Sequence, residues 1–180
     1  LTGNYRELFR RIKTTIAADR LVIDPLRTIA YGSDASFYRL IPKIVINVEN
    51  ELEVQRILRE AGRLELPVTF RAAGTSLSGQ AISDSILVRL GRGWTDFRVF
   101  DQANRIRLQP GMIGSHANRI LAEFDRKIGP DPASIDSAKI GGILANNASG
   151  MCCGVEQNSY RTLDSMRIIL AAGTAVDTAD

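Results

Sequence analysis

The first part of the chain repeats hydrophobic residues at the spacing of one helical face. This spacing of i, i+3, i+4, i+7 and i+11 predicts an amphipathic helix with Asn4 as its N-cap and an end near Asp19. The residues of the stripe are Tyr5, Leu8, Phe9, Ile12 and Ile16. Asp24–Pro25 then marks a break, and residues 27–40 are expected to form irregular connecting structure.

The next segment alternates between strand and helix patterns. Ile44–Val48 is rich in β-branched residues and predicts a short strand, and Pro67–Arg71 predicts another. Between them, Asn50 is expected to cap a helix whose core-facing residues are Val54, Ile57, Leu58 and Ala61. A strand, a helix and a strand in this order predict a parallel βαβ unit with a right-handed crossover.

The remaining chain has shorter periodic segments. Residues 86–90, 97–101 and 105–109 are expected to be strands joined by short polar turns. A helical stripe follows at Ile113, Ala117, Ile120, Leu121 and Phe124. Residues 166–171 and 175–178 flank Ala172-Gly173-Thr174, which is typical of a hairpin.

These patterns predict an α+β protein with a small βαβ subdomain followed by a larger, mostly antiparallel sheet with helices. We expect an N-terminal helix and connecting arm over residues 1–40 and one domain over residues 41–180. Because the chain ends on the expected second strand of the hairpin, we expect this domain to be incomplete at its C-terminal end.

The composition is that of an ordinary globular protein, with 44% hydrophobic and 24% charged residues among 180. The net charge is +3, but no compact Lys/Arg block and no basic stripe interleaved with aromatic residues is present, so nucleic acid is not an expected partner. No apolar run approaches the roughly 18 residues that cross a bilayer. A cytoplasmic location is expected, and attachment to the inner face of the membrane is left open because no amphipathic anchor is evident.

Two glycine-rich runs carry the most informative chemistry. Arg71–Gln80 and Ile140–Gly150 combine small residues with hydroxyl or amide side chains. Glycine lets the backbone approach a ligand closely, and backbone N–H groups donate to phosphate oxygens. Two such runs in one small protein favour a dinucleotide.

Each run alone also fits a structural role. The first lacks the lysine of a nucleoside-triphosphate loop and does not match Gly-x-Gly-x-x-Gly, so it could simply be a tight surface loop. The second could be a helix packed closely against a sheet. Its polar residues Asn146, Asn147 and Ser149 favour a ligand instead.

The remaining reactive side chains predict no metal site and no catalytic group. His116 is the only histidine and borders an apolar helical stripe, which favours a structural or exposed position. Cys152 and Cys153 are adjacent, which suits neither zinc nor iron–sulfur spacing and favours burial as small hydrophobic residues. No nucleophile and base can be paired, so the catalytic residues are not identified.

Four separated motifs resemble a known family. Val68–Gln80 is similar to the pyrophosphate loop of flavoproteins related to vanillyl-alcohol oxidase and p-cresol methylhydroxylase, and the segment from Gly129 to Gly150 is similar to their second FAD-contacting segment. Tyr31–Tyr38 and Met151–Tyr160 narrow the resemblance to FAD-linked D-lactate dehydrogenases, particularly long forms fused to an iron–sulfur module. The resemblance runs from about Asn4 to the C-terminus, with the motifs in the expected order.

This resemblance implies an FAD-binding domain of the p-cresol methylhydroxylase type, with the cofactor between two α+β subdomains. The residues that it implies would hold the diphosphate through backbone amides are Gly74, Thr75, Ser76, Leu77, Ser78 and Gly79. Those that would line the rest of the dinucleotide are Pro130, Ser137, Ile140, Gly141, Gly142, Asn146, Gly150 and Gly154. Some relatives tether FAD through a histidine near the first loop, but residues 71–80 contain none, so non-covalent FAD is expected, with a link to Cys152 or Cys153 as the alternative.

The implied reaction of a full-length relative is oxidation of a D-2-hydroxy acid such as D-lactate by hydride transfer to flavin. Electrons then pass to a quinone, a cytochrome or an iron–sulfur module, and any iron–sulfur cluster would lie outside these residues. Relatives place substrate-binding residues in a cap domain, so we expect this chain alone to be inactive. Glycolate, D-2-hydroxyglutarate and an alkyl-glycerone phosphate are alternative substrates, and a non-catalytic nucleotide-binding or interaction module is the alternative from another class.

Overall fold

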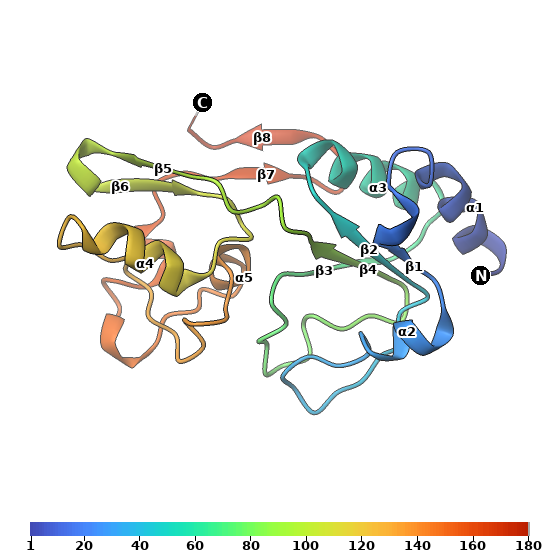
Figure 1. The fold of residues 1–180 in the computed structure, drawn as a ribbon, viewed down its shortest axis with the longest axis horizontal. Coiled ribbons are helices and arrows are strands. Elements are labelled where there is room, and N and C mark those ends of the chain that lie inside the picture. The colour runs from blue at the N-terminus through green and yellow to red at the C-terminus, as the bar shows by residue number, and fades with distance from the viewer. Residues whose placement is uncertain (180) are drawn as a thin grey trace. The chain divides into compact units, whose positions relative to one another are not determined.

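The computed structural model describes residues 1–179, so Asp180, the last residue of the expected domain, lies outside the described residues. The chain folds into two compact units. One contains residues 1–91 together with the C-terminal segment from Ser165, and the other contains residues 92–164 (Figure 1). The α+β class expected from the sequence is confirmed by this mixture of sheet and helices.

The first unit is built on a four-stranded sheet with the order β1-β2-β4-β3. Its strands are β1 (Leu21–Val22), β2 (Ile44–Val48), β3 (Val68–Arg71) and β4 (Ile86–Leu90). β4 lies parallel to both β2 and β3, whereas β1 pairs antiparallel with β2 at the edge. The predicted strands β2 and β3 are therefore parallel but not adjacent, and residues 86–90 join this parallel sheet instead of an antiparallel one.

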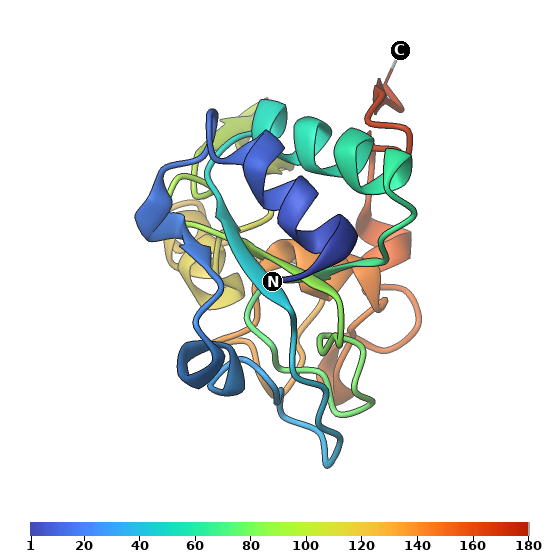
Figure 2. The same ribbon diagram turned by 90° about the vertical axis from the view of Figure 1, so that its right-hand side faces the viewer.

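Two helices lie side by side across one face of this sheet, α1 (Gly3–Ile12) and α3 (Glu51–Arg63) (Figure 2). The Asn50 side chain accepts a hydrogen bond from the Glu53 N–H and caps α3, as predicted. Asn4 does not cap α1, because Thr2 occupies that position and the Asn4 amide donates to the Leu64 carbonyl oxygen instead.

The first helix is also shorter than its hydrophobic stripe predicts. It ends at Ile12, and a turn and the 3₁₀ helix η1 (Ala18–Arg20) follow. Ile16 is nevertheless buried, at 1% exposure. Burial of a periodic residue beyond the helix end explains why the pattern overestimates the helix.

The other face of the sheet is covered near Val45 and Leu87 by Tyr31. Residues 27–40, expected to be irregular, begin inside the short helix α2 (Pro25–Ile29), whose first turn is capped by the Asp24 carboxylate. A proline at the first helical position and an aspartate before it are a helix start signal, so the expectation of irregular structure was wrong there. The rest of the segment has no regular secondary structure apart from an isolated bridge between Ser33 and Arg39.

The C-terminal segment adds the predicted hairpin to the first unit. β7 (Arg167–Ile169) and β8 (Ala175–Asp177) pair antiparallel around Gly173, whose φ is +78°. The Arg167 guanidinium forms an ion pair with Glu51 at the start of α3, at 2.9 Å.

The second unit contains an antiparallel ribbon and short helices. Its elements are β5 (Phe97–Phe100), η2 (Asp101–Ala103), β6 (Arg105–Leu108), α4 (Gly114–Ala122), α5 (Ile140–Ala145), η3 (Met151–Cys153) and α6 (Ser159–Thr162). Their core is formed by Met112, Ala117, Ala138, Ile140 and Ile143. The second glycine-rich run thus begins on the short helix α5, and its residues 146–150 follow that helix. Among the described residues, no helix has both the length and the apolar character that crossing a bilayer requires.

Candidate flavin site

The loop that follows β3 has a backbone that only glycine adopts readily at two positions. Gly74 has a φ of +78° and Gly79 a φ of +72°. A Cβ at Gly79 would also lie 2.8 Å from the Tyr38 ring, so the Tyr31–Tyr38 segment packs directly against the loop. Two left-handed positions turn the chain back within a few residues.

Within the described part of the chain, the N–H groups of Thr75, Ser76 and Leu77 have no protein acceptor. The Ser76 hydroxyl accepts from the Ser78 N–H at 3.2 Å and donates to Gln80, which stiffens the loop from inside. Consecutive unsatisfied N–H groups in a bend form a concave site for an anion. This geometry fits a diphosphate.

Beneath this loop lies Arg71, which is only 7% exposed. Its guanidinium donates from Nε to the Ala81 carbonyl oxygen at 2.6 Å and from Nη2 to the Tyr31 carbonyl oxygen at 3.0 Å. Burial lowers the pKa of Arg71 and the charge of Arg89 lowers it further, but a guanidinium remains protonated at neutral pH. No carboxylate of residues 1–179 forms an ion pair with it.

Asp34 contacts the C-terminal end of the same loop, at Ala81. Its carboxylate accepts from the N–H of Ser36 at 2.8 Å and from the N–H of Ala81 at 3.3 Å. Burial would raise the pKa of Asp34, but the hydrogen bonds from Ser36 and Ala81 and the charge of Arg71 hold it below its ordinary value. The carboxylate is therefore ionised at neutral pH.

A small hollow opens beside this loop in the same unit. It has a volume of about 360 Å³ and is lined by Tyr38, Arg39, Leu40, Ser78, Gly79 and Ile82. Leu77, which directly precedes the lining residue Ser78, is 76% exposed.

In the second unit, the second glycine-rich run uses its N–H groups internally. The N–H of Ile140 donates to the Met112 carbonyl oxygen at 2.8 Å, and that of Gly141 donates to the Pro110 carbonyl oxygen at 2.9 Å. The N–H of Gly142 donates to Lys139. The expectation that both runs bind phosphate through free amides therefore needs revision, because these three amides are already satisfied.

Close backbone packing explains the glycines of this run. A Cβ at Gly141 would lie 2.8 Å from Pro110, and one at Gly150 would collide with the Asp131 carbonyl. The Asp131 N–H in turn donates to the Ser149 carbonyl oxygen at 2.5 Å. The structure thus brings the predicted residues Pro130 and Gly150 into one packed segment.

Ser159 and Tyr160 fasten the end of the same run. The Ser159 hydroxyl donates to the Ala148 carbonyl oxygen at 2.7 Å, and the Asn147 side chain accepts from the Tyr160 N–H at 3.0 Å. Asn147 therefore has a structural partner. Asn146, by contrast, is exposed, as are Ser137 and Gly154.

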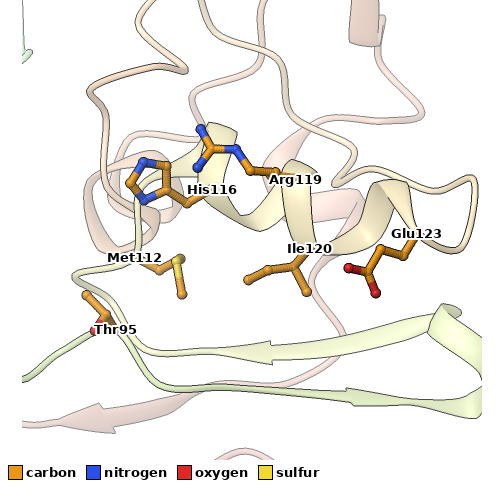
Figure 3. A pocket seen from close by; sticks show the side chains of 6 residues that line it. All are labelled: Thr95, Met112, His116, Arg119, Ile120 and Glu123. Carbon is orange, nitrogen blue, oxygen red and sulfur yellow. The ribbon is translucent and has the colours of Figure 1, made fainter.

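An open groove also lies along α4 in the second unit (Figure 3). Its volume is about 510 Å³, and its lining side chains are Thr95, Met112, His116, Arg119, Ile120 and Glu123. His116 is exposed on it. Cys152 is exposed and Cys153 buried, so the expected burial holds for one of the two thiols. Among the described residues, no group of three or more metal-ligating side chains occurs.

Comparison with known proteins gives the class of this chain. The model of a family described as "FAD binding domain" matches residues 42–179, and the chain belongs to this family. FAD is therefore the cofactor of this domain. The family assignment confirms the resemblance that the sequence motifs indicated.

Curated relatives are oxidoreductases. The chain is 34% identical over 128 residues to the glycolate oxidase subunit GlcD of Escherichia coli K12, and this alignment covers 69% of this chain and 26% of that protein. It is 31% identical over 148 residues to the mitochondrial D-lactate dehydrogenase [cytochrome] 1 of Saccharomyces cerevisiae, which covers 76% and 24%. It is 27% identical over 168 residues to the D-2-hydroxyglutarate dehydrogenase of Pantoea ananatis, which covers 91% and 16%. The chain thus spans about a quarter or less of the length of these relatives.

Solved structures confirm the fold. p-Cresol methylhydroxylase with substrate bound superimposes with a TM-score of 0.80 at 12% identity, which covers 99% of this chain and 36% of that one. An alkyldihydroxyacetonephosphate synthase superimposes with a TM-score of 0.79 at 21% identity, which covers 96% and 34%. The p-cresol methylhydroxylase type of fold expected from the sequence is thereby shown.

The sequence patterns alone did not single out Arg71 or Asp34 as functional residues. For Arg71, the available signal was a charged residue at the end of a strand, directly before a glycine-rich loop. An arginine there is costly to bury unless it has a specific structural or ligand partner.

Proposed function

We propose that this chain is the FAD-binding part of an oxidoreductase that oxidises a 2-hydroxy acid, with a D-lactate-like compound as the first candidate substrate. The support for the substrate class comes from relatives named for glycolate, D-lactate and D-2-hydroxyglutarate. The support for the cofactor is the family match and the loop after β3, whose three free N–H groups suit a diphosphate.

In this proposal each part of the chain has a distinct task. The loop from Gly74 to Gly79 binds the diphosphate through the N–H groups of Thr75, Ser76 and Leu77. The predicted residues of the second unit, Pro130, Ser137, Ile140, Gly141, Gly142, Asn146, Gly150 and Gly154, line the rest of the dinucleotide. The glycines among them permit close approach, and Ser137 and Asn146 offer exposed side chains. The amides at the start of α5 are satisfied within the protein and are not used. The cofactor is held without a covalent bond.

The bound flavin supplies the hydride-accepting chemistry, and the protein orients it. Electrons leave for an acceptor such as a quinone, a cytochrome or an iron–sulfur module. The residues that bind the hydroxy acid are expected outside this chain, because the chain spans only 26% of the glycolate oxidase subunit. The chain alone is therefore proposed to bind FAD without turnover.

The test is a direct titration with FAD. The purified chain is mixed with FAD, unbound cofactor is removed by desalting, and the protein fraction is measured for flavin absorbance and fluorescence. Retained flavin at up to one equivalent supports the proposal, and NAD under the same conditions serves as the comparison. A folded chain that retains neither would contradict FAD binding by these residues and favour a non-catalytic interaction module.

A further inference from the structure

The loop that carries the free amides is fixed at both ends by one short segment of the chain. The Gly74 carbonyl oxygen accepts a hydrogen bond from the Ala35 N–H at 3.0 Å. At the other end, Ala81 has both backbone groups engaged, its N–H by Asp34 and its carbonyl oxygen by Arg71. The segment Tyr31–Ser36 therefore spans the two ends of the loop.

Arg71 is the residue that closes this arrangement. It is the last residue of β3, and its guanidinium bridges the Ala81 and Tyr31 carbonyl oxygens, 10 and 40 positions away in the sequence. Its stem also runs beneath Gly74, because a Cβ there would lie 3.4 Å from the Arg71 Cδ. A planar guanidinium can hold two acceptors in fixed directions at once, which an ammonium cannot do equally well.

The supporting segment is itself held from below. Arg89 on β4 stacks over the Tyr31 ring, with 4.9 Å between the guanidinium carbon and the ring centroid, and donates to the Asn47 side chain on β2. Tyr31 is thus anchored to the central strands of the sheet. Rigid elements transmit their positions to the loop through this contact.

We propose that Arg71 is a positioning residue for the flavin cofactor: with Asp34 it clamps both ends of the Gly74–Ala81 loop, so that the N–H groups of Thr75, Ser76 and Leu77 stay directed at the diphosphate. This proposal rests on the proposed function, because it assumes that the loop binds the FAD diphosphate. Arg71 and Asp34 position the loop and do not themselves touch the cofactor. Preorganised donors lose less entropy when the ligand binds, so the clamp raises cofactor affinity.

The test compares Arg71→Met, Arg71→Lys and Asp34→Asn with the matched control Arg27→Met. Arg27 is exposed in the same unit, and its guanidinium has no partner among residues 1–179. FAD and ADP dissociation constants are measured at a temperature where circular dichroism shows each variant folded. Hydrogen exchange of the Ala35 and Ala81 amides is measured without cofactor.

We expect Arg71→Met to weaken FAD and ADP by about tenfold or more, which is about 1.4 kcal/mol. Arg71→Lys should weaken them less, because one carbonyl remains within reach. Arg71→Met and Asp34→Asn should both speed exchange at Ala81, and Arg27→Met should change nothing. A purely structural role would lower the melting temperature and leave the dissociation constants of the folded variants unchanged.

The outcomes separate the two claims. A wild-type chain that binds no FAD contradicts the proposed function, while hydrogen exchange still tests the clamp. Wild-type binding together with unchanged FAD affinity in folded Arg71→Met overturns the clamp alone, whether or not exchange at Ala81 changes. If Arg71→Met does not fold, Asp34→Asn supplies the same two measurements, and unchanged values in that variant overturn the clamp equally.

Discussion

At the scale of single residues, the candidate site depends on a backbone conformation that most side chains avoid. Gly74 has a φ of +78°, and a Cβ there meets only the flexible stem of Arg71. Strain at this position would therefore come from the dihedral angle and not from a collision. A β-branched residue at positive φ costs roughly 1–3 kcal/mol.

We expect Gly74→Val to lower FAD affinity at least tenfold, because relief of the strain turns the loop amides away from the diphosphate. Gly62→Ala is the matched control, since Gly62 lies in α3 and a Cβ there meets nothing within 4 Å. That substitution should stabilise the protein by about 0.5–1 kcal/mol and leave FAD binding unchanged. Flavin titration and thermal denaturation of both variants measure these effects, and equal affinity for FAD in Gly74→Val would refute the role of its backbone.

A second residue-scale prediction concerns Glu60, a carboxylate that is only 4% exposed. It pairs with Arg11 of α1 at 2.9 Å and with Arg63 at 3.0 Å. Hydrogen bonding to Arg11 holds the pKa of Glu60 below its ordinary value of 4.5, although burial opposes this, and the charges of Arg63 and Arg56 lower it further. The folded state therefore binds this proton more weakly than the unfolded state does.

The stabilisation from Glu60 is then complete above about pH 4.5 and is lost as the pH falls through the lower pKa of the folded state. Glu60→Gln should cost about 1–3 kcal/mol at pH 7, because it removes the charge that the arginines share. It should also flatten the dependence of stability on pH below 4.5. Denaturant unfolding from pH 3 to 7 measures this, with the exposed Glu65→Gln as the control. If the free energy of unfolding depends on pH in the same way in both variants, the ion pairs of Glu60 do not contribute to stability.

At the scale of elements, β4 is the strand on which the first unit depends. It pairs with β2 on one side and β3 on the other, and Leu87 at its centre is completely buried. We expect Leu87→Ala to destabilise the unit by about 2–5 kcal/mol through the cavity that it leaves. Leu52→Ala, at a position that is 75% exposed, should change the free energy of unfolding by less than about 0.5 kcal/mol. Urea denaturation provides both values, and similar midpoints would contradict the central position of β4.

Local signals explain what the sequence could predict about these elements. The β-branched run Ile44–Val48, the cap at Asn50 and the hairpin around Gly173 are each encoded within a few residues, and each is confirmed. The insertion of β4 between β2 and β3 was not predictable in this way, because strand order depends on which segments pair at long range. The uninterrupted run of apolar residues from Ile86 to Val88 in β4 was the signal for a strand buried on both faces.

The same difference between local signals and long-range contacts applies to the candidate site. The strand before Gly74 and the polar loop after it are local features, so the loop was predictable. The use of the Ile140 and Gly141 amides by Met112 and Pro110 was not, because the partners lie about 30 residues away. Arg71 likewise looks like an ordinary strand residue until its contacts with Tyr31 and Ala81 are known.

At the scale of the whole molecule, binding and turnover should be separable. A cofactor that binds only the folded chain raises its stability by about 2.7 kcal/mol when its concentration is 100 times the dissociation constant. We therefore expect the melting temperature to rise with FAD concentration, and to rise more with FAD than with NAD at the same concentration, because NAD shares the diphosphate and lacks the flavin. D-Lactate, glycolate and D-2-hydroxyglutarate, added anaerobically to the FAD-loaded chain, should leave the flavin absorbance unchanged, because the chain spans 16–26% of the relatives named for such substrates. Dithionite, which bleaches any accessible bound flavin, is the positive control. Bleaching by one hydroxy acid would show that the substrate site lies within these residues and would direct the search to the exposed side chains around the loop after β3.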